Sequence, residues 1–151
     1  MTDSAPFRIG NLDHVVIRTA QPDALLDFYL ALGCTVAREV PDLGLQQLWA
    51  GSSVIDLVDA DGLLGQMGGP APGPEGRNMD HFALRIEPFD RDVLHAHFDA
   101  AGIEWADPPV DLFGAEGVGP ALYVKDPDGN TVELKGPPND DQTDPLLGSG
   151  S

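Results

Sequence analysis

Two segments of the sequence place the same polar residues at the same spacing. They read NLDHVVIRT from residue 11 and NMDHFALRI from residue 78, so each carries one histidine, His14 or His81. Near the end of each half, a short apolar segment contains one carboxylate, Asp56 in VIDLV and Glu133 in TVELK. Neutral imidazole and ionised carboxylate are the usual nitrogen and oxygen ligands of Zn, Ni, Co, Mn and Fe(II). The repeat therefore predicts a site for one divalent transition metal, with coordination positions left for a substrate.

The alternation of residues along the expected strands puts the four candidate ligands on equivalent faces. Side chains two apart in a strand point to the same side, so His14 lies opposite to Val15 and Ile17. The consistently apolar positions are Val15, Ile17, Ile55, Leu57, Phe82, Leu84, Ile86, Val132 and Leu134. We expect helices to cover those apolar faces and the four candidate ligands to lie on the opposite, open faces.

The order of the expected elements is the same in both halves. Periodicity predicts strands at 12–18, 34–40, 45–51 and 53–59 with a helix at 21–33, then strands at 80–86, 103–105, 119–126 and 131–135 with a helix at 89–102. Pro22 suits a first helical turn, and Gly33 and Gly102 suit helix ends. The sequence thus predicts an α+β fold of two βαβββ modules whose open sheets form a half-barrel crevice.

The domain organisation follows from these elements. We expect an N-terminal arm at 1–9, a first module at 10–60, a Gly/Pro-rich linker at 61–77, a second module at 78–136 and a disordered tail at 137–151. Residues 107–119 are expected to form a long loop. The linker is a candidate cover for the crevice.

Composition limits the partners and the compartment. The chain has 151 residues and a formal net charge of −17, with 25 acidic and 8 basic residues and no Lys/Arg cluster. Such a chain is not expected to bind nucleic acid or an anionic membrane. Cys34 is the single cysteine, which excludes an intrachain disulfide and favours a buried structural thiol. No leader sequence or long apolar segment is evident, so the expectation is a soluble cytoplasmic protein.

Four segments, LDHVVIRT, FYLALGCTV, DHFALRI and LYVKDPDGNTVEL, resemble the vicinal oxygen chelate superfamily over about residues 10–136. This superfamily includes glyoxalase I, extradiol dioxygenases, fosfomycin-resistance proteins, methylmalonyl-CoA epimerase and bleomycin-resistance proteins. The resemblance implies a divalent ion at His14, His81 and Glu133, which match the family's metal positions. Asp56 stands where glyoxalase I carries a glutamate. Its shorter side chain leaves open whether it binds the ion directly or through water.

Several functions are compatible with this resemblance. The first is a glyoxalase-like lyase or isomerase whose substrate chelates the ion through two vicinal oxygens, with Glu133 as the catalytic base and Asp56 as the second candidate. The second is a non-haem Fe(II) extradiol-type dioxygenase, although Tyr123 is not placed by the pattern on the face of the metal residues. The third is a drug- or metabolite-binding protein of the bleomycin-resistance kind, whose members typically lack the metal residues.

Substrate and assembly stay open at this point. Arg18 and Arg85 share the face of the histidines and either bind an anionic substrate group or pair with surface carboxylates. Glutathione, another thiol, a 2-oxoaldehyde, a catechol and an acyl-CoA are all compatible small-molecule substrates. A homodimer is expected from the superfamily, with the modules pairing either within one chain or between two chains.

Overall fold

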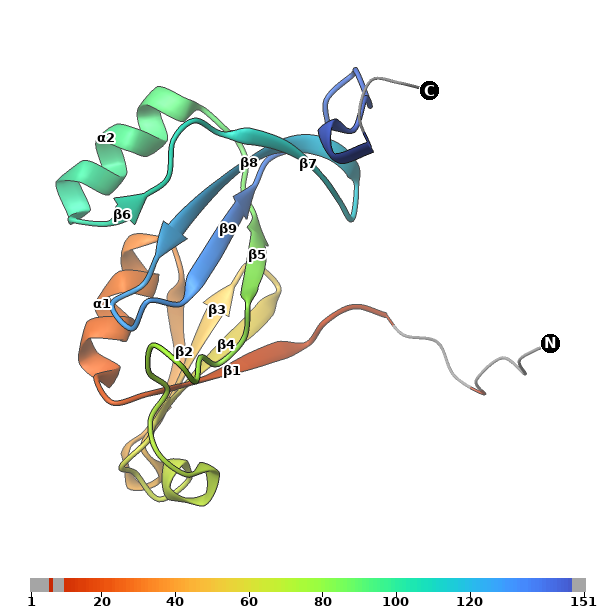
Figure 1. Ribbon diagram of the computed structural model, residues 1–151. Coiled ribbons are helices and arrows are strands. Elements are labelled where there is room, and N and C mark those ends of the chain that lie inside the picture. The colour runs from red at the N-terminus through yellow and green to blue at the C-terminus, as the bar shows by residue number, and fades with distance from the viewer. Residues whose placement is uncertain (1–5, 7–9, 148–151) are drawn as a thin grey trace.

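The first module is a four-stranded mixed sheet with one covering helix. The computed structural model describes residue 6 and residues 10–147, so the expected arm at 1–9 lies almost entirely outside the described residues (Figure 1). The module contains β1 (His14–Thr19), α1 (Pro22–Ala31), β2 (Thr35–Val40), the 3₁₀ helix η1 (Pro41–Leu43), β3 (Leu45–Ala50) and β4 (Ser53–Asp59). The strand order is β1-β4-β3-β2, with β1 parallel to β4 and the other pairs antiparallel. The expected element order of this module is confirmed.

The second module repeats this topology and adds one strand. After the 3₁₀ helix η2 (Gly65–Gly68) it contains β5 (His81–Arg85), α2 (Arg91–Ala101), β6 (Glu104–Trp105), β7 (Val110–Gly114), β8 (Gly117–Lys125) and β9 (Thr131–Lys135). The order is β5-β9-β8-β6, and β7 pairs with the first part of β8. The α+β fold of two related modules is therefore as predicted. No helix among the described residues is long and apolar enough to cross a membrane.

Two segments differ from the sequence-based expectation. The expected loop at 107–119 contains β7, which forms a tight hairpin with β8 through the Gly114–Gly117 pair. Residues 137–147, expected to be a disordered tail, include the 3₁₀ helix η3 (Pro145–Leu147). The Gln142 side chain accepts a hydrogen bond from the Val118 backbone N–H (2.7 Å) and donates one to the Val118 carbonyl (3.0 Å). This amide satisfies backbone groups of β8 and so gives the segment a defined position.

The two modules share one hydrophobic core. Both helices lie on the same side of the sheets (Figure 1), and the apolar faces predicted from strand alternation are the buried ones, with Ile17 and Ile55 each 1% exposed and Val132 fully buried. Tyr29 of α1 is fully buried, and its hydroxyl donates to Asp126 Oδ2 of the second module (2.9 Å). The first module is thereby fixed to the second through α1.

Strands β1 and β5 are edge strands, and one amide holds their nearest ends together. The Asn78 side chain, just before β5, accepts from the Arg18 backbone N–H and donates to the Arg18 carbonyl, both at 3.1 Å. From this contact the two strands diverge (Figure 1). Each module therefore presents its first strand as an unpaired edge over most of its length.

A candidate metal centre in two halves

The first half of the candidate centre lies on β1 and β4. His14 begins β1, and its Nδ1–H donates to Asp13 Oδ2 at 2.7 Å. This hydrogen bond, assisted by the negative charge of Asp56, raises the pKa of His14 above its usual value. Since Nδ1 carries the proton, Nε2 keeps the lone pair that a metal ion would need.

Asp56 in the middle of β4 is held by a hydrogen-bonded chain that crosses the sheet. Its side chain is 7% exposed, and Gln47 Nε2 donates to Asp56 Oδ1 at 2.8 Å. Gln47 lies directly opposite Asp56 in the β3–β4 register, and Arg38 of β2 donates in turn to Gln47 Oε1. The neutral amide fixes one carboxylate oxygen and leaves the other for a further partner.

The second half, on β5 and β9, has the same plan with a different carboxylate and a different neutral donor. His81 Nδ1 donates to Asp80 Oδ2 at 2.6 Å, and His81 Nε2 lies 3.5 Å from Glu133 Oε1. The Tyr123 hydroxyl, opposite Glu133 in the β8–β9 register, donates to that same oxygen at 2.9 Å. The Tyr123 ring also meets the His81 ring edge-on, with centroids 5.7 Å apart. Burial and the bond to Glu133 raise the pKa of Tyr123 to about 12.

Gln47 and Tyr123 are therefore functional candidates that sequence reasoning missed. Each stands across a hairpin from the carboxylate that it contacts, and residues directly opposite in an antiparallel pair point to the same face. Counting the register backwards from Asp56 and Glu133 through each hairpin turn would have found both. The pattern placed Tyr123 away from the candidate site, whereas the structure places it in contact with Glu133.

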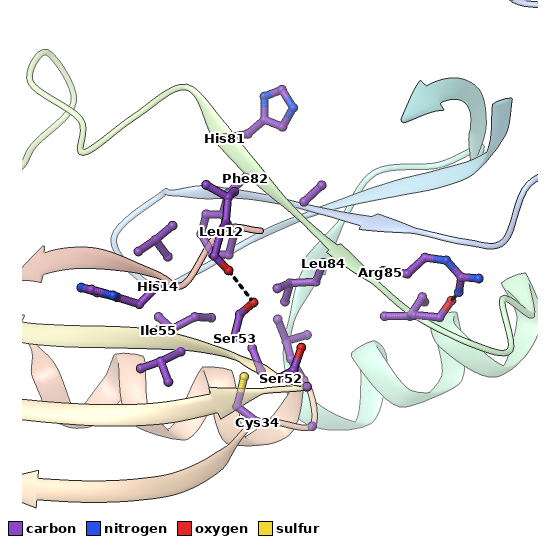
Figure 2. A pocket seen from close by; sticks show the side chains of 18 of the residues that line it. Leu12, His14, Cys34, Ser52, Ser53, Ile55, His81, Phe82, Leu84 and Arg85 are labelled. Carbon is purple, nitrogen blue, oxygen red and sulfur yellow. Dashed lines mark hydrogen bonds between the residues drawn. The ribbon is translucent and has the colours of Figure 1, made fainter. Parts of the chain in front are cut away.

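The four candidate ligands do not meet within one chain. Over residues 10–147, no three His, Cys, Asp or Glu side chains come close enough to hold one ion. His14 and His81 line a common cavity of about 850 Å³ between the diverging edges of β1 and β5, yet their rings extend away from one another (Figure 2). The remaining wall of this cavity is mostly apolar, with Ile55, Phe82 and Leu84 prominent. The candidate ligands therefore lie in two separate groups, one in each module, which we call the candidate half-sites.

Arg18, predicted as a substrate ligand, is engaged within the chain. Its guanidinium donates to the carbonyls of Gly65 (2.8 Å), Gly69 (2.6 Å) and Pro70 (2.9 Å), all in the linker. A Cβ on Gly68 would come within 2.6 Å of Arg18 Nε, so a larger residue there would push the guanidinium out of its present position. Arg18 therefore anchors the Gly/Pro-rich linker beside the end of β1.

Arg85 is engaged as well, though at the surface. Its Nε lies 2.5 Å from Glu116 Oε2, and its Nη1 donates to the Ile86 carbonyl at 2.6 Å, the bond drawn in Figure 2. Glu87 lies 3.6 Å away. These partners hold the pKa of Arg85 above its usual value, mainly through the bond to Glu116.

Comparison with known proteins identifies the fold family. Residues 11–134 match the family model described as the Glyoxalase/Bleomycin resistance protein/Dioxygenase superfamily. The chain belongs to this superfamily. A glyoxalase domain-containing protein, RDO1, of Mycosarcoma maydis is 30% identical over 136 residues, covering 83% of this chain and 68% of that protein.

Solved structures of the superfamily fold agree with this assignment. The virulence protein STM3117 of Salmonella typhimurium superposes with a TM-score of 0.70 at 22% identity, covering 87% of this chain and 99% of its own. A lactoylglutathione lyase of Agrobacterium tumefaciens gives a TM-score of 0.61 at 20% identity, covering 85% and 94%. The resemblance read from the sequence motifs is confirmed at the level of the superfamily.

The donor set in the two half-sites fits a divalent transition metal. In both modules an aspartate fixes the imidazole so that Nε2 is the free nitrogen, an arrangement in which metal-binding histidines are usually found. In both modules the carboxylate is oriented by a neutral donor, Gln47 or Tyr123, and not neutralised by a cation. Two imidazoles and two carboxylates that are oriented in this way suit Ni, Co, Zn, Mn or Fe(II).

Proposed function

We propose that this superfamily member is a metal-dependent enzyme of the glyoxalase type, a lyase or isomerase that acts on a small substrate with two vicinal oxygens. His14, His81 and Glu133 would hold the ion, and Asp56 would bind it directly or through water. The observation that carries the proposal is the repeated half-site, in which each histidine is oriented by the preceding aspartate and accompanied by a buried carboxylate.

A second copy of the chain would complete the centre. In one chain the two half-sites lie apart, and both β1 and β5 are edge strands with unpaired backbone groups. Unpaired edges favour pairing with another chain. We infer a homodimer in which the first module of each subunit faces the second module of its partner, giving two equivalent sites.

The residues of the second half-site would carry the proton transfer. A bound divalent ion would polarise the two oxygens of the substrate and make the hydrogen on the adjacent carbon more acidic. Oε2 of Glu133 would remove this proton and return it to the neighbouring carbon of the substrate, because Oε1 already accepts a hydrogen bond from the Tyr123 hydroxyl. The single hydrogen bond from Tyr123 would orient the carboxylate and still allow it to move. Asp56, bonded to Gln47, is the second candidate base.

One observation supports a second candidate, an Fe(II)-dependent ring-cleaving dioxygenase. The Tyr123 hydroxyl donates to Glu133 and the Tyr123 ring meets the His81 ring edge-on, a place where a phenol could donate a proton to an oxygen-containing substrate. Oxygen consumption with catechols after loading with Fe(II) is expected for this activity. Lyase activity on 2-oxoaldehydes with a thiol, supported by Ni, Co or Zn, is expected for the first.

The test is elemental analysis of the native protein together with His14→Ala, His81→Ala and the control His97→Ala. His97 lies on α2 and bonds to the Ala31 carbonyl, away from both half-sites. We expect about one metal per chain in the native protein and in the control, and loss of metal in the other two variants. A native protein that neither contains nor takes up a transition metal would contradict the proposal.

Mixing the two deficient variants tests where the site is built. If each site combines one module from each subunit, a mixed dimer of His14→Ala and His81→Ala contains one intact site and one doubly deficient site. Random exchange of subunits should then restore about a quarter of the native metal content. No restoration, in a mixture shown by mass spectrometry to contain mixed dimers, would place each site within one chain.

A further inference from the structure

The cavity between β1 and β5 is an opening into the hydrophobic core. On the face of the sheets that the helices cover, side chains elsewhere are removed from water, with Ile17 1% and Leu57 0% exposed. Along the cavity, Val15 of β1 and Phe82 and Leu84 of β5 lie on this same face and are only partly buried (Figure 2). The cavity of about 850 Å³ therefore leaves part of the core uncovered.

The arrangement of the edge strands explains this opening. Asn78 holds β1 and β5 together at one end only, and beyond it the strands diverge (Figure 1). Residues 32–34, which follow α1, and the turn between β3 and β4 form a further part of the wall. A second copy that paired with the free edges would bond to their backbone groups in the plane of the sheet, and would leave the space on the helix side of the strands open.

The size of the cavity suits a small molecule. Sites for small molecules have volumes of about 300–1,000 Å³ and are lined mainly by apolar side chains. This cavity has a volume of about 850 Å³, and Ile55, Phe82 and Leu84 are prominent in its wall (Figure 2). A ligand in it would remove these side chains from water, which is the driving force for apolar binding.

The lining also determines the charge of the molecule that fits. Among the described residues of the wall there is no carboxylate, and the basic side chains are His14, His81 and Arg85. Each of the three is already bonded to a carboxylate. The thiol of Cys34 is neutral, because burial raises its pKa. An ionised ligand would lose its hydration there without gaining a free counter-charge.

We propose that the cavity between β1 and β5 binds an uncharged, predominantly apolar small molecule. The site is distinct from the candidate metal centre, because its wall is built mainly from the helix-covered faces, whereas the candidate ligands of the ion lie on the open faces. It goes beyond the proposed function and needs no metal.

The test uses two fluorescent probes that share one aromatic skeleton. N-phenyl-1-naphthylamine is uncharged, and 8-anilino-1-naphthalenesulfonate carries an additional sulfonate. In a titration of the full chain after treatment with EDTA, the uncharged probe should bind saturably, with about one equivalent per chain. The sulfonate should bind at least about tenfold more weakly, because it would bury a negative charge in a chain whose net charge is −17.

A matched pair of variants locates the bound probe. Leu84→Trp places a larger side chain in the cavity and should weaken binding of the uncharged probe by about tenfold or more. Leu147→Trp makes the same change on η3, outside the cavity, where the side chain is 83% exposed, and should leave the affinity unchanged. Circular dichroism and the melting temperature check that both variants are folded.

Cys34 provides a second measurement that needs no substitution in the core. It is the only cysteine of the chain, it lines the cavity, and it is 7% exposed. Methyl methanethiosulfonate converts an accessible thiolate into a mixed methyl disulfide with release of methanesulfinate. A saturating concentration of the uncharged probe should slow this reaction by about tenfold or more, because the reagent reaches the thiol through the cavity.

Three results would overturn the proposal. A native chain that does not bind the uncharged probe saturably would show that the cavity is closed, as it would be if a second copy filled it. Equal affinities for the two probes would contradict the assignment of an uncharged ligand. Unchanged affinity in Leu84→Trp, or a reaction of Cys34 that the probe does not slow, would place the binding elsewhere on the chain.

Discussion

The contact between Tyr123 and Glu133 predicts a measurable titration. Burial is the main cause that raises the pKa of Tyr123 to about 12, and the hydrogen bond to Glu133 is the next. Glu133→Gln replaces a charged acceptor by a neutral one, and a hydrogen bond to a charged group is stronger by about 1–1.5 kcal/mol. Since 1.36 kcal/mol corresponds to one pKa unit, the Tyr123 pKa should fall by about one unit. Burial should hold it above the ordinary tyrosine value.

The assay is the near-ultraviolet absorbance of tyrosinate as the pH is raised. The chain has only two tyrosines, and burial beside Asp126 raises the pKa of Tyr29 beyond that of Tyr123, so the first step belongs to Tyr123. Tyr123→Phe should abolish this step, and circular dichroism should show a folded chain throughout it. An unchanged midpoint in Glu133→Gln would mean that the bond to Glu133 contributes nothing.

The raised pKa of Tyr123 also makes the stability of the folded chain depend on pH. Because the folded-state pKa of Tyr123 lies above the unfolded value of about 10, the folded state holds this proton more tightly. The resulting stabilisation is present below pH about 10 and is lost as the pH rises through about 12. Glu133→Gln should reduce the part of this alkaline loss that comes from Tyr123.

Two further substitutions test how the modules and the linker are held. Tyr29→Phe removes a hydrogen-bond donor from the buried Asp126 carboxylate. We therefore expect the free energy of unfolding, measured by urea denaturation, to fall by about 1–3 kcal/mol. A loss below about 0.5 kcal/mol would contradict the reasoning. Gly68→Ala should displace the Arg18 guanidinium and release the linker from it. Limited proteolysis within residues 61–77 should then become faster, while the melting temperature changes little. An unchanged cleavage pattern would show that Arg18 does not anchor this segment.

The fold could be predicted because its signals are local. Alternation in the strands and helical periodicity in 21–33 and 89–102 depend on neighbours within a few residues, and the duplication provided the same signal twice. β7 was missed because it is five residues long, follows two prolines and ends in glycine. Its pairing with β8 depends on a turn that composition alone assigns to a loop.

The strand faces on which the candidate ligands lie could be predicted for the same reason, but the surroundings of these residues could not. Strand parity sufficed to place His14 and Asp56 on one face, and His81 and Glu133 on another. The partners of Arg18 are backbone carbonyls of the linker. Every residue has such a carbonyl, so the sequence does not show which of them will accept a hydrogen bond from a side chain. Any joining of the two candidate half-sites into one centre would depend on contacts between modules or between chains, which a strand pattern does not encode.

The difference between Gln47 and Tyr123 assigns unequal roles to two otherwise equivalent carboxylates. Asp56 accepts from an amide whose own oxygen is bonded to Arg38, so moving Asp56 would break a chain that crosses three strands. Glu133 accepts from a single phenol, and its longer side chain has one more rotatable bond with which to change position. In the proposed enzyme, a carboxylate that would both hold the ion and move a proton needs the second kind of environment. For the proposed enzyme, the unequal support of the two modules therefore favours Glu133 as the mobile base and Asp56 as the fixed member of the centre.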